Sequence, residues 1–439
     1  MARIYPFRAW RYNPSTVRLD DVVTQPYDKI SPAMQQAYYQ RSPYNLVRII
    51  LGLPELFDAE QGENVYTRAA RDFRAWREQG VLVQEKEPCV FAYAQRFTVP
   101  GTDIVKERRG FISLGKLHEY AEQVVFRHEQ TLTGPKADRL NLLKATRAHY
   151  GQVFMLYSDP ARAVESILYN GGAADAEVTD EYGVQHRLWR ISDPATINLL
   201  ATAMADKKLI IADGHHRYET ALQYAKSHAG NGTARAEHSV TQLPQPPYPE
   251  AAVMMTFVNM DSDGLVILPT HRVVHSLQGF DVAAFAKAAE QFFAVSALPA
   301  GDAERCLQTL KNETGPAFVA VIPNGALLLR SKPESTAALA GVPERQRQLD
   351  LTHLHALVLD RLLGLDAEKV SQQTNIRYLR DAGEAVEQVR RGEADIAFLT
   401  NPVTMEQLKE VAFAGEVMPQ KSTDFYPKLL SGLTIYALE

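Results

Sequence analysis

The sequence is poor in several features that mark common classes of protein. It has 2 cysteines in 439 residues, Cys89 and Cys306, and neither stands in a C-x-x-C pair. A disulfide framework and a cysteine-ligated zinc site are therefore excluded. The longest apolar stretch, near residues 251–260, has only about ten residues, which is too few to cross a bilayer. The first residues contain no apolar core of the kind that a secretory signal has, so we expect a cytoplasmic protein with no membrane partner.

The chain also has no excess of positive charge. It contains 47 basic and 52 acidic residues, which gives a formal net charge of −5. Proteins that bind duplex DNA usually carry a basic excess, so we do not expect nucleic acid as a partner. With 46% hydrophobic and 23% charged residues, the composition is that of a globular protein and excludes a coiled coil, a collagen-like fibre and a mostly disordered chain. The length predicts two or three domains.

Four familiar catalytic signatures are missing from the sequence. It contains no G-x-x-x-x-G-K-[ST], no G-x-G-x-x-G, no G-x-S-x-G and no H-E-x-x-H. Each of these patterns places a particular chemical group on a particular strand–helix junction or helix face. Their absence removes P-loop kinases, Rossmann dehydrogenases, α/β-hydrolases and zincins from the leading candidates.

The patterns that are present mix helices and strands. Residues 65–76 place apolar side chains at helical spacing, whereas residues 90–98 alternate and predict the first strand of a hairpin. Residues 194–230 read as helix, strand, helix. This mixture predicts an α+β or mixed α/β fold. A Pro-rich interval, expected to be a loop, predicts an amino-terminal α+β region of residues 1–249 and a carboxy-terminal α/β region of residues 250–439 that can contribute to the same site.

The sharpest local feature is the segment I-A-D-G-H-H-R-Y-E-T, where an apolar strand ends in Asp213-Gly214 and a helix begins at once. The first N–H groups of a helix lack intrahelical partners and carry the positive end of its dipole, so such a turn can hold a phosphate. Gly214 would let the phosphate approach the backbone closely. Three residues of the first helical turn add donors or positive charge: His215, His216 and Arg217.

Plainer interpretations of this turn remain open. Asp213 could simply cap the helix, since Asp is favoured at that position. Asp213, His215 and His216 could also bind a metal ion, although adjacent residues on a helix diverge by about 100°, which makes joint ligation awkward. Asp213 is in either case the first candidate for a metal ligand.

Other segments combine charged and polar residues in expected loops. His128 and Glu129 form a possible acid–base couple, and the cations Lys136 and Arg139 follow them, although an ion-paired surface turn would look the same. Asp28 could be a general base or an ordinary turn residue. Further candidates are Asn45, Arg48, His271 and Arg272 for binding a substrate, and Lys421 and Lys428 for reaching a phosphate.

Several of these motifs, taken together and in order, resemble a widespread microbial family, domain-of-unknown-function family 1015. They are QPYDKIS, SPYNLVR, RHEQTLTGPKADRLNLLKAT, IADGHHRYETA, LPTHR, GEADIAFLTNP and MPQKSTDFYPKLLSGL. The resemblance runs from Tyr5 to about Leu433, nearly the whole chain. Most members of the family have no assigned function, so the resemblance predicts no activity by itself.

A more distant resemblance concerns the D-G-H-H-R turn, which is similar to that of the ParB/sulfiredoxin superfamily. Free-serine kinases of that superfamily carry a similar turn and transfer a phosphoryl group from a nucleotide to the serine hydroxyl. The resemblance implies a ParB/sulfiredoxin-like nucleotide-binding element elaborated by additional α/β regions. It implies phosphate contacts for His216 and Arg217, and it places Asp213 or His215 near the transferred group. For the carboxylate base of those kinases, Asp28 and Glu129 are both candidates.

These observations lead to three hypotheses. The first is a nucleotide-dependent phosphotransferase that uses ATP or ADP with Mg²⁺ and phosphorylates a small hydroxyl metabolite such as serine. Phosphoryl transfer requires cations around the phosphate oxygens and a carboxylate or imidazole beside the nucleophile. The second is a ParB-like nucleotide-binding switch or nucleic-acid-associated protein, and the third is a metal-dependent hydrolase that uses the histidines. The sequence does not indicate an oligomeric state.

Overall fold

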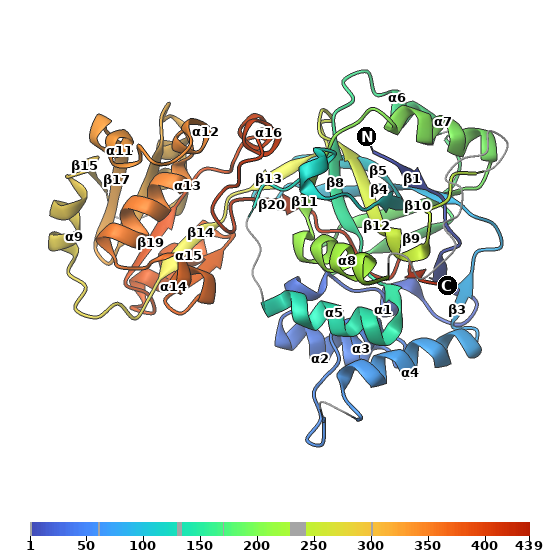
Figure 1. Ribbon diagram of the computed structural model, residues 1–439. Coiled ribbons are helices and arrows are strands. Elements are labelled where there is room, and N and C mark those ends of the chain that lie inside the picture. Colours follow the sequence, from blue (N-terminus) through green and yellow to red (C-terminus); the bar gives the residue numbers. More distant parts are fainter. Residues whose placement is uncertain (1, 60–61, 130–133, 170, 229–242, 300–301) are drawn as a thin grey trace. The chain divides into compact units, whose positions relative to one another are not determined.

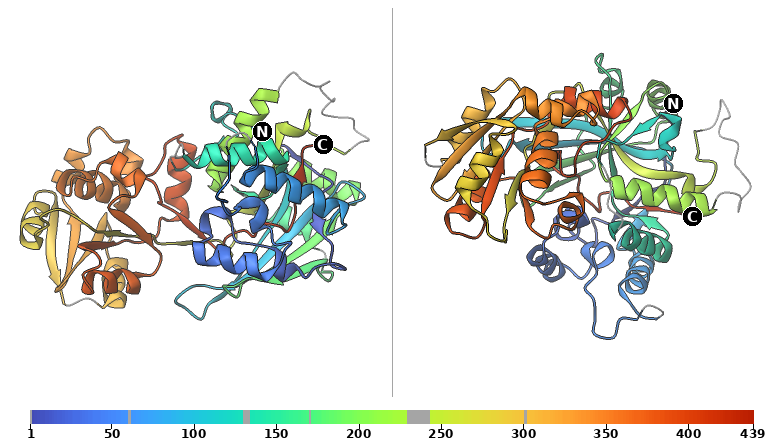
Figure 2. Two further views of the ribbon diagram at one scale, coloured as in Figure 1. Left: turned by 90° about the horizontal axis from the view of Figure 1, so that it is seen from below. Right: turned by 60° about the vertical axis from the view of Figure 1, so that its left-hand side comes forward.

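In the computed structural model, the chain is described over residues 2–59, 62–129, 134–169, 171–228, 243–299 and 302–439. It forms two compact units. The first comprises Met1–Phe126, Leu132–Val266 and Pro427–Glu439, and the second comprises Arg127–Thr131 and Ile267–Tyr426. Both chain termini therefore belong to the first unit, as Figures 1 and 2 show. The fold is α+β, with mixed parallel and antiparallel strand pairing.

The two units do not divide at the boundary expected near residue 249. Strand β12 (Ala252–Asn259) follows the Pro-rich interval, yet it pairs with two strands of the first unit, β5 and β8. The last residues of the chain also return to the first unit. Residues 229–242 of the Pro-rich interval lie outside the described residues, as do residues 130–133 of the R-H-E-Q-T segment.

The first unit is built on a nine-stranded sheet with the order β6-β11-β8-β12-β5-β4-β10-β9, to which β1 adds by pairing with β5. The pairs β6–β11 and β8–β12 are parallel, and the others are antiparallel. The strands of this unit are β1 (Ile4–Tyr5), β2 (Trp10–Tyr12), β3 (Leu82–Gln84), β4 (Val90–Thr98), β5 (Val105–Lys116), β6 (Val125–Phe126), β7 (Ala148–His149), β8 (Val153–Tyr157), β9 (Ala176–Thr179), β10 (Gln185–Ile191), β11 (Leu209–Asp213), β12 and β21 (Tyr436–Ala437).

The helices of the first unit lie in groups around this sheet. Helices α2 to α5 gather on one side in Figure 1 and α6 and α7 on the other, and α8 packs against α5. The helices are α1 (Leu19–Val22), η1 (Tyr27–Lys29), α2 (Pro32–Arg41), α3 (Val47–Ile50), α4 (Val65–Glu78), η2 (Tyr120–Glu122), α5 (Gly134–Thr146), α6 (Ala163–Leu168), α7 (Pro194–Met204), α8 (His215–His228) and η3 (Pro249–Ala251).

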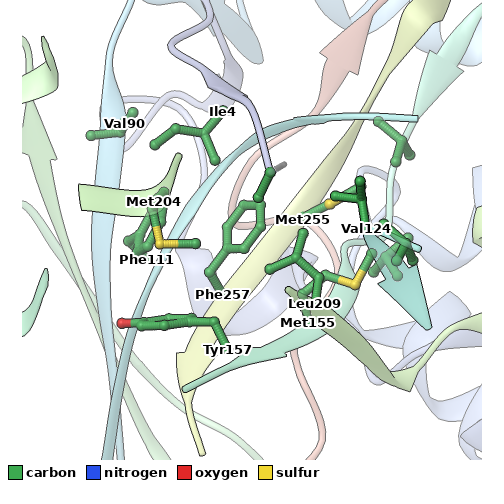
Figure 3. Close-up of a cluster of buried hydrophobic side chains, with 14 of the residues drawn as sticks. Ile4, Val90, Phe111, Val124, Met155, Tyr157, Met204, Leu209, Met255 and Phe257 are labelled. Atoms are coloured by element: carbon green, nitrogen blue, oxygen red, sulfur yellow. The ribbon is translucent and has the colours of Figure 1, made fainter. Parts of the chain in front are cut away.

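The core of the first unit lies against the central strands of its sheet. Phe111 of β5 stacks on Phe257 of β12 with ring centroids 4.9 Å apart. Met155 and Met204 extend the same cluster, which Figure 3 shows. Burying a large apolar side chain contributes about 1.5–3 kcal/mol, so this cluster fixes the central strands, including β11, whose end carries the D-G-H-H-R turn.

The second unit contains a six-stranded antiparallel sheet with the order β15-β17-β16-β19-β14-β18. Helices α10 and α15 pack on its core. Its elements are β13 (Val266–Leu268), which begins at the boundary, β14 (His271–Val274), α9 (Val282–Ala289), β15 (Phe293–Leu298), α10 (Ala303–Lys311), β16 (Ala317–Ile322), β17 (Gly325–Ser331), α11 (Pro333–Ala338), α12 (Glu344–Arg347), α13 (Asp350–His353), the π-helix η4 (Leu354–Leu362), α14 (Ala367–Gln372), β18 (Ile376–Leu379), α15 (Ala382–Arg390), β19 (Ile396–Leu399), α16 (Met405–Phe413) and β20 (Asp424–Tyr426).

Much of the local structure follows the sequence patterns. Helix α4 covers the segment with helical apolar spacing, β4 and β5 form the expected hairpin, and α7, β11 and α8 give the expected helix, strand, helix. Strand β4 differs in one respect, because its first six residues are buried on both faces rather than on one. None of the helices in the described residues combines the length and apolar character that crossing a bilayer requires.

Candidate phosphate-binding site

The D-G-H-H-R turn joins strand β11 to helix α8 through one glycine. Gly214 has φ +89°, a conformation that side chains with a Cβ rarely adopt. A Cβ added to Gly214 would lie 3.0 Å from Cζ of Arg217. Glycine is thus required twice here, once for the backbone conformation and once for the space that the arginine fills.

Arg217 folds back from α8 over this turn. Its Nη1 donates to the carbonyl oxygen of Gln152, and its Nη2 donates to Oδ2 of Asp213 over 3.3 Å. A Cβ on Gly151 would lie 3.3 Å from Nη1, so a second glycine makes room for the guanidinium. Since an arginine has five N–H donors, these two bonds orient the guanidinium and leave it further donors for an anion.

Asp213 stands at the end of β11 among positive charges. Its side chain is 23% exposed. Burial acts to raise the pKa of Asp213, but the positive charges of Lys428, Arg217 and Lys29 outweigh it and hold this pKa well below its usual value. Asp213 is therefore ionised at any ordinary pH. Within the described residues its carboxylate accepts from Arg217 and not from a helix N–H, so it does not cap α8.

Lys428 reaches this site because two buried side chains hold the backbone around it. Nη2 of Arg108 donates to the carbonyl oxygen of Pro427 over 2.5 Å, and Nε2 of Gln95 donates to that of Lys428 over 2.8 Å. Nε of Arg108 also donates to Oε1 of Gln95 over 3.0 Å. Arg108 is only 1% exposed, and burial lowers its pKa to about 10. Arg108 and Gln95 are therefore positioning residues for Lys428.

The Q-P-Y-D-K segment brings a second group of residues to the same unit. Nε2 of Gln25 donates to Oδ2 of Asp180 over 3.1 Å and anchors the segment. Burial raises the pKa of Tyr27, the charge of Asp28 raises it further, and the charges of Arg139 and Arg217 oppose this. The charges of Asp28 and Arg217 therefore both act on the hydroxyl of Tyr27. Asp28 itself is exposed.

A cavity of about 60 Å³ lies beside Arg217. Tyr27, Arg139 and Thr220 contribute to its wall, and the guanidinium of Arg139 stacks 4.0 Å from the centre of the Tyr27 ring. Thr220 is 3% exposed, and its Oγ1 has no hydrogen-bond partner among the residues that the structure describes. An unsatisfied buried hydroxyl costs about 1–3 kcal/mol.

The cations Lys136 and Arg139 have internal partners. Lys136 forms an ion pair with Glu219 of α8. Nη1 of Arg139 donates to the carbonyl oxygen of Ile50 over 2.8 Å, and its Nε donates to Asp138 over 2.8 Å. These bonds hold α5 against its neighbours, which gives both cations a structural role beside the predicted phosphate contact.

Asn45 and Arg48 also make contacts that fix local structure. Asn45 is fully buried, its Nδ2 donates to the carbonyl oxygen of Asp21 over 2.8 Å, and its Oδ1 accepts from N–H of Val47 over 3.0 Å. Nη2 of Arg48 donates to the carbonyl oxygen of Tyr39 over 2.9 Å. These bonds shape the loop before α3, and neither residue lines the cavity beside Arg217.

Five of the predicted site residues belong to the second unit, and two of them hold the backbone of a third. Glu129 accepts from N–H of Lys421 over 2.9 Å through its Oε1, and Nη2 of Arg272 donates to the carbonyl oxygen of Lys421 over 3.0 Å. Lys421 has φ +56°, an uncommon conformation for a residue with a side chain. The two contacts impose this conformation, which costs about 1–2 kcal/mol.

The two predicted histidines of the second unit are buried. Nε2 of His128 lies 2.7 Å from Oγ1 of Thr423. Nδ1 of His271 accepts from N–H of Thr400 over 3.3 Å, and burial, then the charge of Arg272, lowers the pKa of His271 to about 4. Both imidazoles thus have partners within their own unit.

His215 and His216 begin α8 immediately after the turn, as predicted. The charge of His215 is among those that lower the pKa of Asp213. Over the described ranges, no group of three or more His, Cys, Asp and Glu side chains is arranged to hold a metal ion.

Sequence reasoning missed residues that this site depends on. The charge of Lys29 acts on Asp213, and the carbonyl oxygen of Gln152 accepts from Arg217. Gln95 and Arg108 instead hold the backbone at Pro427 and Lys428. Gln95 carried a signal, because it is a polar residue among the aromatic side chains of an apolar strand. Lys29 follows Asp28 directly, but nothing in the sequence relates it to Asp213.

We expect Asp213→Asn to lower the free energy of unfolding by about 2 kcal/mol at neutral pH, because it removes a charged hydrogen bond. The folded-state pKa of Asp213 lies below the unfolded value of about 3.9. The stabilisation by Asp213 is therefore complete above about pH 5 and is lost as the pH falls through the folded-state pKa. Urea unfolding of both proteins between pH 3 and pH 8 measures the difference. A difference that grows toward acid pH would contradict this electrostatic description.

Comparisons with known proteins identify the family. Two similar solved structures are a conserved hypothetical protein from Pyrococcus furiosus (12% identity, 71% of this chain and 91% of that chain, TM-score 0.34) and a mutant free serine kinase in complex with ADP (12% identity, 71% and 89%, TM-score 0.36). No curated protein matches the sequence. The model of the family described as "Protein of unknown function (DUF1015)" matches residues 4–352, most of the chain. The chain belongs to this family.

Proposed function

We propose that this protein is a nucleotide-dependent phosphotransferase that phosphorylates the hydroxyl of a small metabolite, with free serine as the first acceptor to test. The observation that carries the proposal is the turn itself, where Arg217 folds back from α8 and pairs with Asp213 over 3.3 Å. The charges of Lys428 and Lys29 act on the same carboxylate. Phosphoryl transfer needs cations in such an arrangement, because charge is spread over three phosphate oxygens.

The turn supports phosphate binding in a second way. The guanidinium of Arg217 lies against Gly214, so an anion at the start of α8 would meet this cation together with the first backbone N–H groups of the helix. The helix dipole adds roughly half a positive charge at the same place. We assign the phosphates of ATP or ADP to this turn, with Arg217 and Lys428 as the contacting cations and His216 beside them.

Asp213 fits the role of a protein ligand for Mg²⁺. Mg²⁺ in nucleotide sites commonly takes one or two carboxylates together with phosphate oxygens and waters. Asp213 supplies one such carboxylate and is ionised at neutral pH. The bound ion would neutralise the charge that develops on the phosphates. Without phosphates present, the surrounding cations oppose metal binding, so we expect Mg²⁺ and nucleotide to bind together.

The cavity beside Arg217 fits the acceptor. Its volume of about 60 Å³ corresponds to a few non-hydrogen atoms, which fits a small acceptor. Arg217 and Arg139 offer positive charge to a carboxylate. These groups match a small, polar, carboxylate-bearing alcohol.

In the transfer step, the acceptor oxygen forms a bond to the terminal phosphorus as the bond from that phosphorus to the nucleotide oxygen breaks. The acceptor proton passes to a carboxylate. Asp28 is our first candidate for this base, because it lies near the Tyr27 ring that forms part of the cavity wall. Glu129 is the alternative that the sequence offers, and its Oε1 accepts from the backbone N–H of Lys421 within the second unit.

We expect a nucleotide to raise the melting temperature of the wild type and Arg217→Ala to abolish this shift. A ligand present at a hundred times its dissociation constant stabilises a protein by about 2.7 kcal/mol. The measurement is a thermal-shift titration with ATP, ADP, CTP and GTP, with and without Mg²⁺. Arg96→Ala, which removes an exposed arginine of the same sheet, should keep the wild-type shift. An equal shift in all three proteins would place the nucleotide elsewhere.

We expect replacement of the base to lower kcat for serine phosphorylation by about 10²–10⁴-fold while nucleotide affinity is retained. Asp28→Asn and Glu129→Gln preserve shape and remove the proton acceptor, so a phosphate-release assay on both variants identifies the base. Equal kcat in both variants and the wild type contradicts a role for either carboxylate. Nucleotide binding without turnover on any hydroxy amino acid would instead favour a nucleotide-binding switch.

A further inference from the structure

Two segments that carry cations of the proposed site are joined through their backbones. N–H of Thr24 donates to the carbonyl oxygen of Ser431 over 3.1 Å, and N–H of Ser431 donates to that of Thr24 over 2.9 Å. Thr24 directly precedes the Q-P-Y-D-K segment, residues 25–29, which ends in Lys29. Ser431 follows Lys428 by three residues. A group that holds both segments therefore also holds both of these lysines.

His186 of strand β10 connects side chains that hold the two segments. It is 1% exposed. Its Nε2 lies 3.2 Å from Oδ2 of Asp180, which also accepts from Nε2 of Gln25 over 3.1 Å. Its Nδ1 lies 2.6 Å from the hydroxyl oxygen of Tyr93 and 3.4 Å from Nε2 of Gln95. One edge of the imidazole thus contacts the carboxylate that anchors Gln25, and the other edge contacts Gln95.

Gln95 makes the connection to the second segment. Its Nε2 donates to the carbonyl oxygen of Lys428 over 2.8 Å, and its Oε1 accepts from Nε of Arg108 over 3.0 Å. Arg108 also donates to the carbonyl oxygen of Pro427. A guanidinium has donors only, so the amide of Gln95 must turn its oxygen toward Arg108 and its nitrogen toward Lys428 and His186. Nδ1 of His186 is therefore required as an acceptor.

The surroundings of His186 also fix the position of its proton. Burial acts to raise the pKa of Asp180, but hydrogen bonds from His186, Val184 and Gln25 hold this pKa below its usual value. Burial lowers the pKa of His186, although Asp180 opposes this. A neutral imidazole has one donor nitrogen and one acceptor nitrogen. Nε2 therefore donates to the ionised Asp180, and Nδ1 accepts from the hydroxyl of Tyr93.

We propose that His186 is a positioning residue, whose neutral imidazole couples the Q-P-Y-D-K segment to the segment 427–431. Its effect on phosphate binding rests on the function proposed above, whereas the coupling itself does not. Without the acceptor at Nδ1, the hydroxyl of Tyr93 loses its partner, and a buried polar group without a partner is costly. The side chains around it would then rearrange, and the backbone that Gln95 holds would move with them.

The first test is the tautomer of His186 in the wild-type protein. ¹⁵N NMR spectra of protein with labelled histidines distinguish protonated from unprotonated ring nitrogens. The signal of His186 is assigned by its absence in His186→Gln or by its shift in Tyr93→Phe. At neutral pH we expect a proton on Nε2 and none on Nδ1. A proton on Nδ1 would overturn the proposal, because that nitrogen could then accept from neither Tyr93 nor Gln95.

The second test is hydrogen-exchange mass spectrometry of full-length variants. His186→Gln keeps a donor for Asp180 and removes the acceptor for Tyr93. We expect about tenfold faster amide exchange in residues 24–29 and 427–431, with unchanged exchange in strand β12. Tyr93→Phe removes the same hydrogen bond from its other end and should give the same pattern, which keeps the test decisive if His186→Gln does not fold.

His118→Gln is the matched control. His118 is another buried histidine of the first unit, and its Nδ1 lies 2.8 Å from a carboxylate oxygen of Glu122. This variant should exchange as the wild type does in both segments. Unchanged exchange in His186→Gln and Tyr93→Phe, or a change in only one segment, overturns the coupling. Faster exchange that extends to β12 also overturns it, since that pattern marks a general loss of stability.

Binding of ADP separates this inference from the proposed function. We expect ADP to bind His186→Gln about tenfold more weakly than the wild type in calorimetric titrations with Mg²⁺, and to bind His118→Gln as tightly as the wild type. Equal affinity for His186→Gln and the wild type overturns the positioning role in phosphate binding. A wild type that binds no ADP contradicts the proposed function instead, and the exchange measurements then decide the coupling by themselves.

Discussion

The ionised carboxylate of Asp213 among three cations is the interaction on which the proposed site depends. Lys428, Arg217 and Lys29 come from the end of the chain, from α8 and from the amino-terminal segment. Opposite charges attract, so the carboxylate of Asp213 favours the placement of these three side chains near the turn. In the function that we propose, the same cations attract the phosphates of a nucleotide.

A buried constraint places the most distant of these cations. Lys428 lies in a segment that returns to the first unit at Pro427. The side chain of Arg108 donates a hydrogen bond to the carbonyl oxygen of Pro427, and that of Gln95 donates to the carbonyl oxygen of Lys428. Both side chains are buried in the sheet of the first unit. Removing a charged arginine from water is costly unless its donors are satisfied. These carbonyl contacts therefore serve two purposes, since they satisfy Arg108 and they fix the backbone that carries Lys428.

Residue spacing and turn residues in the sequence predict individual helices, strands and turns well. They predict the contacts between distant segments of the chain poorly. The D-G-H-H-R turn, helix α4 and the β4–β5 hairpin follow from periodicity and turn residues alone. The positions of Lys29 and Arg108 depend on strand order, which no local pattern encodes. The sequence leaves open whether Glu129, Arg272 and Lys421 share a site with Asp213, and the structure shows that they contact one another within the second unit. In the sequence, charged residues that bind a ligand look the same as charged residues that contact one another.

The most direct test of the account is a crystal structure of the wild-type protein grown with ADP and Mg²⁺. The account predicts phosphate oxygens within hydrogen-bonding distance, about 2.7–3.2 Å, of the first backbone N–H groups of α8 and of the side chains of Arg217 and Lys428. It also predicts Asp213 as the protein ligand of the metal ion. A nucleotide bound elsewhere, with the turn at Gly214 holding no phosphate, would contradict it.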